Sequence, residues 1–68
     1  MIIGRIILIE HCGKPTVWPV ERLGDDDSEH LKRTFEKAKE FCSYEIGLGG
    51  TLKLFDSANS LVEEYRGV

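Results

Sequence analysis

The sequence predicts an α+β fold, with three antiparallel strands, a long helix on one face of their sheet and a short C-terminal helix. Three observations support it: an isoleucine-rich run at the N-terminus, apolar residues at helical spacing in the middle, and turn residues between the segments. Hydrophobic residues make up 41% of the chain and charged residues 31%, which is typical of globular proteins. Its 68 residues predict one domain spanning 1–68.

Residues 2–10 predict the first strand, because five of the first nine residues are isoleucine. Successive side chains of a strand point to opposite faces, and here both alternating sets are apolar. Such a strand needs cover on both faces. Residues 11–15 contain Gly13 and Pro15 and predict a turn, and residues 16–20 predict a second strand. Pro19 has no N–H to donate, so this strand is expected at a sheet edge.

Residues 27–46 predict the long helix. Asp26 and Glu29 have the spacing of a capping box, and neighbouring carboxylates suit the positive end of the helix dipole. Gly47 is expected just beyond the last turn. Apolar side chains recur at helical spacing on one face, at Leu31, Phe35, Ala38, Phe41, Cys42 and Ile46.

The remaining residues predict a turn, a strand and a short helix. Residues 47–50 contain three glycines, and residues 51–55 predict the third strand. Asp56 or Ser57 can cap a final helix, with Ser60 as a competing start. Its expected apolar stripe contains Ala58, Leu61, Val62 and Tyr65. The predicted element order is therefore β-β-α-β-α.

Connection rules predict a sheet order of 2-1-3, a split β-α-β arrangement with the isoleucine strand in the middle. If the turn pairs His11 with Thr16, the residues Ile3, Ile7, Ile9, Trp18 and Val20 share one face, joined by Leu52 and Leu54. The opposite face then holds the set Ile2, Ile6, Leu8, Val17 and Phe55. A one-residue change of register exchanges the members of these sets.

A crossover helix covers only one face, so the second set is expected to form an interface with a partner. Large exposed apolar patches normally mark interfaces. A homodimer is the default partner because two-fold self-association is the commonest oligomer. The leading hypothesis is therefore a non-enzymatic protein–protein interaction or regulatory module that associates with itself, or with another protein, through its sheet.

Two other functions are weighed against this one. A split β-α-β sheet with aromatic and basic residues can bind single-stranded nucleic acid, and Phe55, Lys53, Trp18 and Arg5 could serve. The net charge of −3 argues against it. A small enzyme or redox protein would centre on Cys12, beside His11 and near Lys14. Sequence neighbours rarely align as a nucleophile and its base.

No catalytic, cofactor-binding or metal-ligating residue is assigned. His11, Cys12, His30 and Cys42 lack the paired spacing of a zinc site. The glycines at 47–50 follow a helix instead of preceding one, which is the wrong order for a phosphate loop. The acidic residues at 25–27 are explained by helix capping. No apolar run is long enough for a membrane span, and two cysteines are too few for a disulfide scaffold, so a cytoplasmic location is expected.

Overall fold

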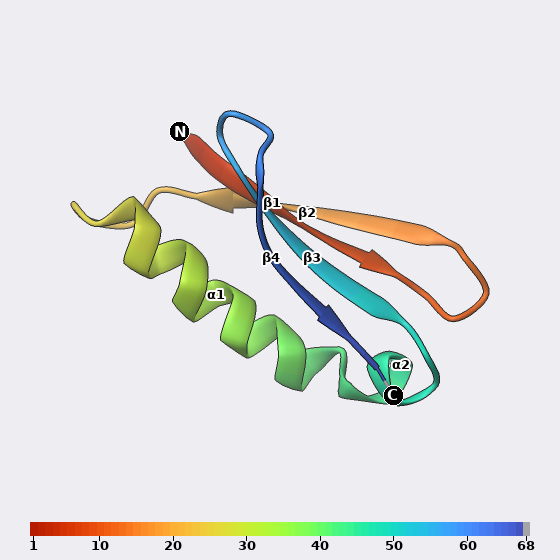
Figure 1. The fold of residues 1–68 in the computed structure, drawn as a ribbon. Coiled ribbons are helices and arrows are strands. Elements are labelled where there is room, and N and C mark those ends of the chain that lie inside the picture. Colours follow the sequence, from red (N-terminus) through yellow and green to blue (C-terminus); the bar gives the residue numbers. More distant parts are fainter. Residues whose placement is uncertain (68) are drawn as a thin grey trace.

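The computed structural model describes residues 1–67 and arranges them as β-β-α-α-β-β (Figure 1). The strands are β1 (Ile2–Ile9), β2 (Pro15–Glu21), β3 (Thr51–Asp56) and β4 (Leu61–Arg66). The helices are α1 (Asp27–Phe41) and α2 (Ser43–Gly47). The α+β class with an antiparallel sheet is as predicted.

The sheet has the strand order β2-β1-β3-β4, and every neighbouring pair is antiparallel. The isoleucine strand lies between β2 and β3, as predicted, and β2 lies at an edge, as Pro19 indicated. The predicted three-stranded order 2-1-3 is incomplete, because β4 adds a fourth strand beside β3. Helix α1 crosses one face of this sheet, and within residues 1–67 no helix lies on the opposite face (Figure 1).

The predicted C-terminal helix is wrong, because residues 61–66 form β4. Asp56 Oδ1 accepts hydrogen bonds from the backbone N–H groups of Ala58 and Ser60, at 2.9 and 3.0 Å. Asn59 adopts the left-handed conformation, with φ of 64°, that closes the hairpin. An aspartate that accepts backbone N–H bonds can start a helix or shape a turn, and both patterns are the same in sequence. A short isolated helix is costly to nucleate, whereas pairing beside β3 gives backbone hydrogen bonds to both strands.

The predicted helix over 27–46 is also interrupted. Asp26 caps α1 as predicted, since its Oδ1 accepts from the backbone N–H of Glu29 at 3.0 Å. Cys42 breaks the helix, with φ of −98° and ψ of 14°, and α2 follows. This break turns the chain so that both Cys42 and Ile46 are buried. The glycine that takes the left-handed conformation here is Gly49, with φ of 107°, instead of Gly47.

The register of the first hairpin differs from the prediction by three residues. Thr16 pairs with Leu8 instead of His11, and Trp18 pairs with Ile6 instead of Ile9. The loop spans residues 10–14, where Gly13 has φ of 92° and the Glu10 N–H donates to the Lys14 carbonyl at 2.9 Å. Because the shift is an odd number of residues, Trp18 and Val20 share a face with Ile6 and Leu8 instead of with Ile7 and Ile9. Ile6 and Leu8 therefore lie under α1, and Ile7 and Ile9 lie on the opposite face.

The core lies between α1 and the sheet. Its fully covered residues are Phe35 of the helix and Leu52 and Leu54 of β3. The other buried residues are Ile3, Ile6, Leu8, Val20, Leu31, Cys42 and Ile46. A bulge at Ile3 turns both Ile3 and Gly4 toward the helix. A Cβ at Gly4 would lie only 2.4 Å from the carbonyl oxygen of Phe55 in β3 and 2.7 Å from Cδ2 of Leu31 in α1, so glycine lets both elements approach here.

Candidate functional site: the open face of the sheet and its flanks

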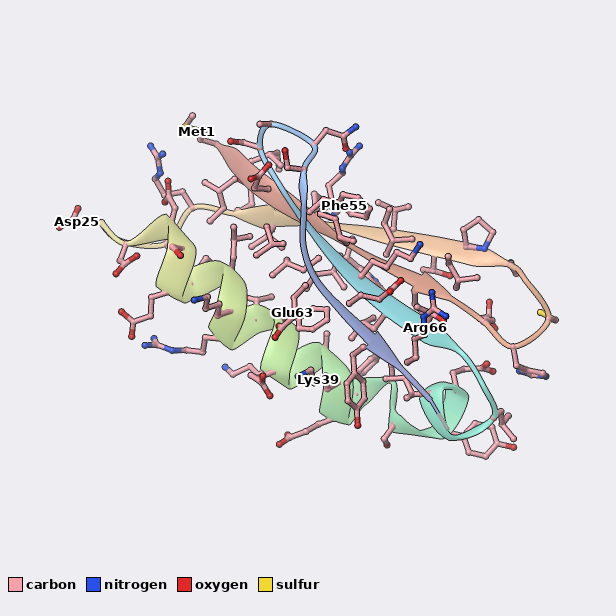
Figure 2. The ribbon with its side chains drawn as sticks, in the orientation of Figure 1. Met1, Asp25, Lys39, Phe55, Glu63 and Arg66 are labelled. Carbon is pink, nitrogen blue, oxygen red and sulfur yellow. The ribbon has the colours of Figure 1, made fainter. Side chains whose placement is uncertain are left out.

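The face of the sheet opposite α1, called here the open face, is mostly apolar. The register places Ile7, Ile9, Val17 and Phe55 on it, with Pro15, Pro19 and Leu61 around them. Val17 is 51% exposed, and Ile7, Ile9 and Phe55 are half-buried among their neighbours. No element of residues 1–67 packs over these side chains, and Figure 2 shows Phe55 on the side away from α1. An apolar surface of this kind is typical of an interface.

The charges of the open face lie mainly on its β3–β4 half. Lys53 Nζ is 3.7 Å from Glu64 Oε1, and Arg66 Nε is 3.4 Å from Glu64 Oε2. Arg5 also points to this face, beside Phe55. The β1–β2 half carries Arg5 and, at the far end of β2, Glu21, and its other side chains on this face are apolar. The open face therefore has an apolar half and an ion-paired half.

The five residues predicted as a partner interface do not share this face. Val17 and Phe55 lie on it, and Ile2, the first residue of β1, is 43% exposed. Ile6 and Leu8 instead lie in the core beneath α1, because of the changed hairpin register. Ile7 and Ile9 take the positions that the prediction gave to Ile6 and Leu8.

The edge of the sheet at β2 is blocked for strand addition. Pro15, Val17 and Pro19 occupy alternate positions, so their backbone nitrogens point in the same direction. Proline has no N–H, and the β1 side of the ladder is already paired, so the outer edge loses donors at Pro15 and Pro19. A partner can contact this part of the molecule through side chains but cannot extend the ladder there.

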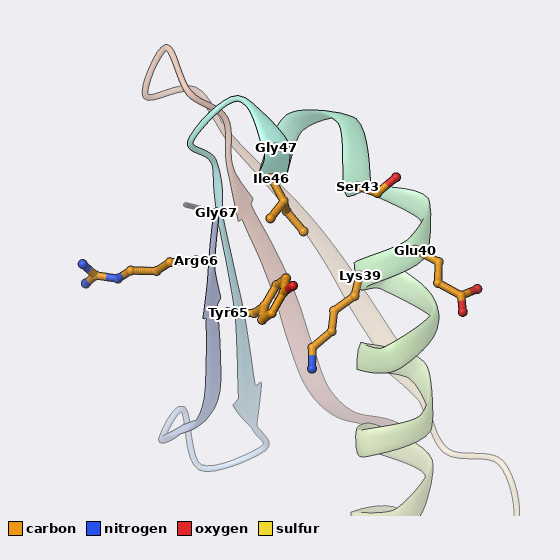
Figure 3. A pocket seen from close by; sticks show the side chains of 8 residues that line it. All are labelled: Lys39, Glu40, Ser43, Ile46, Gly47, Tyr65, Arg66 and Gly67. Carbon is orange, nitrogen blue, oxygen red and sulfur yellow. The ribbon is translucent and has the colours of Figure 1, made fainter.

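On the other side, α1 is narrower than the sheet it covers. Four strands span about 19 Å and a helix about 10 Å, so a single helix leaves a hollow along each flank. The hollow beside β4, of about 430 Å³, lies between Tyr65 and the end of α1 (Figure 3). Lys39 Nζ lies 5.2 Å from the Phe35 ring centre and 4.8 Å from that of Tyr65. Because Tyr65 belongs to β4, the Lys39 ammonium group links α1 to β4. Glu36 accepts a hydrogen bond from Lys39 Nζ at 3.0 Å, which raises the pKa of Lys39.

The hollow beside β2, called here the α1–β2 groove, is more apolar and has a volume of about 330 Å³. Its floor is formed by Ile6, Ala38 and Cys42, and its rims by Trp18 of β2 and Phe41 of α1. Trp18 is 36% exposed and Phe41 is 83% exposed. Phe41 belongs to the stripe that the sequence assigned to the core. It is exposed because the buried side of α1 runs from Phe35 through Ala38 to Cys42, and Phe41 lies about 100° away from Cys42 around the helix axis.

The loop near Cys12 contains one contact that the sequence does not predict. His11 Nδ1 donates to Glu45 Oε2 at 2.8 Å, which joins the β1–β2 loop to α2 and lowers the pKa of Glu45. Cys12 is exposed, but among the described contacts it has no hydrogen bond to His11. Burial raises the pKa of the Cys42 thiol. No nucleophile–base pair is therefore formed within residues 1–67.

The other sequence candidates occupy structural positions. Asp26 caps α1, and Asp27 accepts two hydrogen bonds from Arg22, which lowers the pKa of Asp27. Gly50 lies where α2 meets β1, and a Cβ at this position would come within 2.9 Å of the Glu45 carbonyl oxygen. No group of three or more His, Cys, Asp or Glu side chains in the described part of the chain is placed to hold a metal ion. None of the helices described over 1–67 has the length and apolar character needed to cross a membrane.

The chain matches no protein-family model, no curated protein and no solved structure.

Proposed function

We propose that this chain is a non-enzymatic protein-interaction module that associates with a second copy through the apolar half of its open face. The observation that carries the proposal is the uncovered set Ile7, Ile9, Val17 and Phe55 on an otherwise complete α/β sandwich. Exposed apolar area of this kind is stabilised by burial against another protein surface.

The division of the open face favours one arrangement of the two copies. A two-fold axis that lies in the interface and runs across the strands places β1 and β2 of one copy over β1 and β2 of the other. The apolar halves then meet, and the Lys53–Glu64–Arg66 cluster stays at the rim of the interface. An axis along the strands would bury these charges against apolar side chains, which is unfavourable.

The size of the face predicts a weak, reversible dimer. A sheet about 19 Å wide and about 20 Å long covers roughly 400 Å² per copy, or roughly 800 Å² for two. This is at the low end of specific interfaces, where complexes are transient. Pro15 and Pro19 prevent the alternative of pairing through the β2 edge.

Sedimentation velocity from low to high micromolar concentration tests the proposal, with two valine variants as a matched pair. Val17 is 51% exposed on the open face, whereas Val62 is 44% exposed and lies beside Ile3 and Leu31 on the helix side. Val17→Asp is expected to abolish the concentration-dependent increase in sedimentation, and Val62→Asp to leave it unchanged. A wild-type monomer throughout, or equal effects of both variants, would contradict the proposal.

Single-stranded nucleic acid is the second candidate, favoured by the charges of the open face. The open face has three cationic side chains, Arg5, Lys53 and Arg66, and two acidic ones, Glu21 and Glu64. Phe55 is available there for stacking. Two of these cations are already ion-paired, which reduces what they offer to phosphate. Titration with a fluorescent oligouridine at two salt concentrations separates the candidates. Salt-sensitive binding that Phe55→Ala removes would favour nucleic acid over self-association.

A further inference from the structure

We infer that the α1–β2 groove is a binding site for a long-chain carboxylate, with the alkyl chain between Trp18 and Phe41 and the carboxylate at Lys37. The inference is independent of the proposed self-association, because the groove lies on the helix side of the sheet. It is argued from the shape of the groove, from the polar groups that line it and from the loss of two backbone donors, at Pro15 and Pro19, along its outer wall.

The shape suits a narrow apolar occupant. The groove has about 330 Å³, which is within the usual range for small-molecule sites. Because α1 lies over the middle of the sheet, the flank beside β2 is only about 5 Å wide, half the diameter of a helix. A partner helix cannot enter it, whereas a single alkyl chain can. The exposed rings of Trp18 and Phe41 would close over such a chain from the two rims.

Apart from the Trp18 indole N–H and the Cys42 thiol, the groove has two polar side chains, Thr34 and Lys37. Thr34 Oγ1 donates to the backbone carbonyl of His30 at 2.8 Å. Lys37 is exposed at the rim and has no ion pair within residues 1–67. No acidic residue lines the groove, and burial keeps the Cys42 thiol in its neutral form. The groove therefore offers a ligand one cationic donor and otherwise apolar surface, which fits a chain with a single anionic head.

The same inventory argues against an extended peptide. A peptide carries an N–H and a C=O at each residue, and burying them unpaired is costly. The outer wall is β2, whose edge lacks donors at Pro15 and Pro19. An alkyl chain has no N–H or C=O groups, so it leaves no polar group of its own unpaired in this groove.

Fluorescence titration with dodecanoate, kept below its micellar concentration, tests the inference directly. Trp18 is the only tryptophan of the chain, so its emission reports on the groove itself. Saturable binding with a blue shift of the emission is expected. Phe41→Ala should weaken it about tenfold through lost apolar contact. Lys37→Gln should weaken it by about two- to fivefold, the range for an exposed ion pair.

Two matched variants and one further ligand complete the experiment. Tyr44→Ala and Lys32→Gln change similarly exposed residues that do not line the groove, and both should bind as wild type does. Dodecyltrimethylammonium has the same alkyl chain and the opposite charge. Wild type should bind it more weakly than dodecanoate, whereas Lys37→Gln should bind the two ligands with equal affinity. No saturable binding, equal affinity of wild type for both ligands, or equal losses in the groove and control variants would overturn the inference. Each outcome is independent of the sedimentation result.

Discussion

Replacement of Phe35 by alanine is predicted to remove most of the stability of the fold. Phe35 is 0% exposed and packs in the core with Leu52 and Leu54, which are also fully covered. Truncating a buried phenylalanine costs about 3–5 kcal/mol, from lost burial and from the cavity that it leaves. The core of a chain this short supplies only about 3–5 kcal/mol in total. The Phe35→Ala variant is therefore expected to be largely unfolded at 25 °C.

The matched control is Phe41→Ala, the same change six positions along the same helix. Phe41 is 83% exposed, so its truncation is expected to alter the free energy of unfolding by no more than about 0.5 kcal/mol. Urea denaturation followed by circular dichroism at 222 nm measures both values. Protein concentration must be held constant, since self-association would add to the apparent stability. Similar losses in the two variants would refute the assignment of Phe35 to the core and Phe41 to the surface.

Three further predictions concern the backbone, acid stability and the thiols. Gly4→Ala is expected to lower the urea midpoint, because the new Cβ would lie 2.4 Å from a β3 carbonyl oxygen; an unchanged midpoint would contradict this close approach. The hydrogen bond from His11 holds the pKa of Glu45 below its usual 4.5. This hydrogen bond therefore contributes to stability above pH 4.5, and the contribution is lost as the pH falls through the pKa of Glu45 in the folded protein. Wild type should accordingly be more stable than Glu45→Gln at pH 7, and the difference should shrink in thermal melts as the pH is lowered below 4.5. Cys12 is exposed and Cys42 buried, so iodoacetamide and mass spectrometry should find one thiol modified in the native protein and two in urea.

Local signals accounted for much of the fold. The β1–β2 hairpin, the Asp26 cap of α1 and the third strand each depend on neighbouring residues alone, and each was predictable within a few positions. The edge position of β2 followed from Pro19, since proline cannot donate to a ladder. The interface residues were predictable only in part. Val17 and Phe55 lie on the open face, whereas an odd error in register exchanged Ile6 and Leu8 for Ile7 and Ile9.

By itself, the sequence determined that the central strand is apolar on both faces and that one helix is available to cover it. Only the tertiary structure decided which face of the central strand the helix covers. That choice depends on the register of the β1–β2 hairpin, where a shift of one residue exchanges the two faces. The tertiary structure also decided that residues 61–66 form a strand, since the unpaired edge of β3 outweighs the helical spacing of a short segment. The α1–β2 groove had no sequence signal, because it results from the difference in width between one helix and four strands.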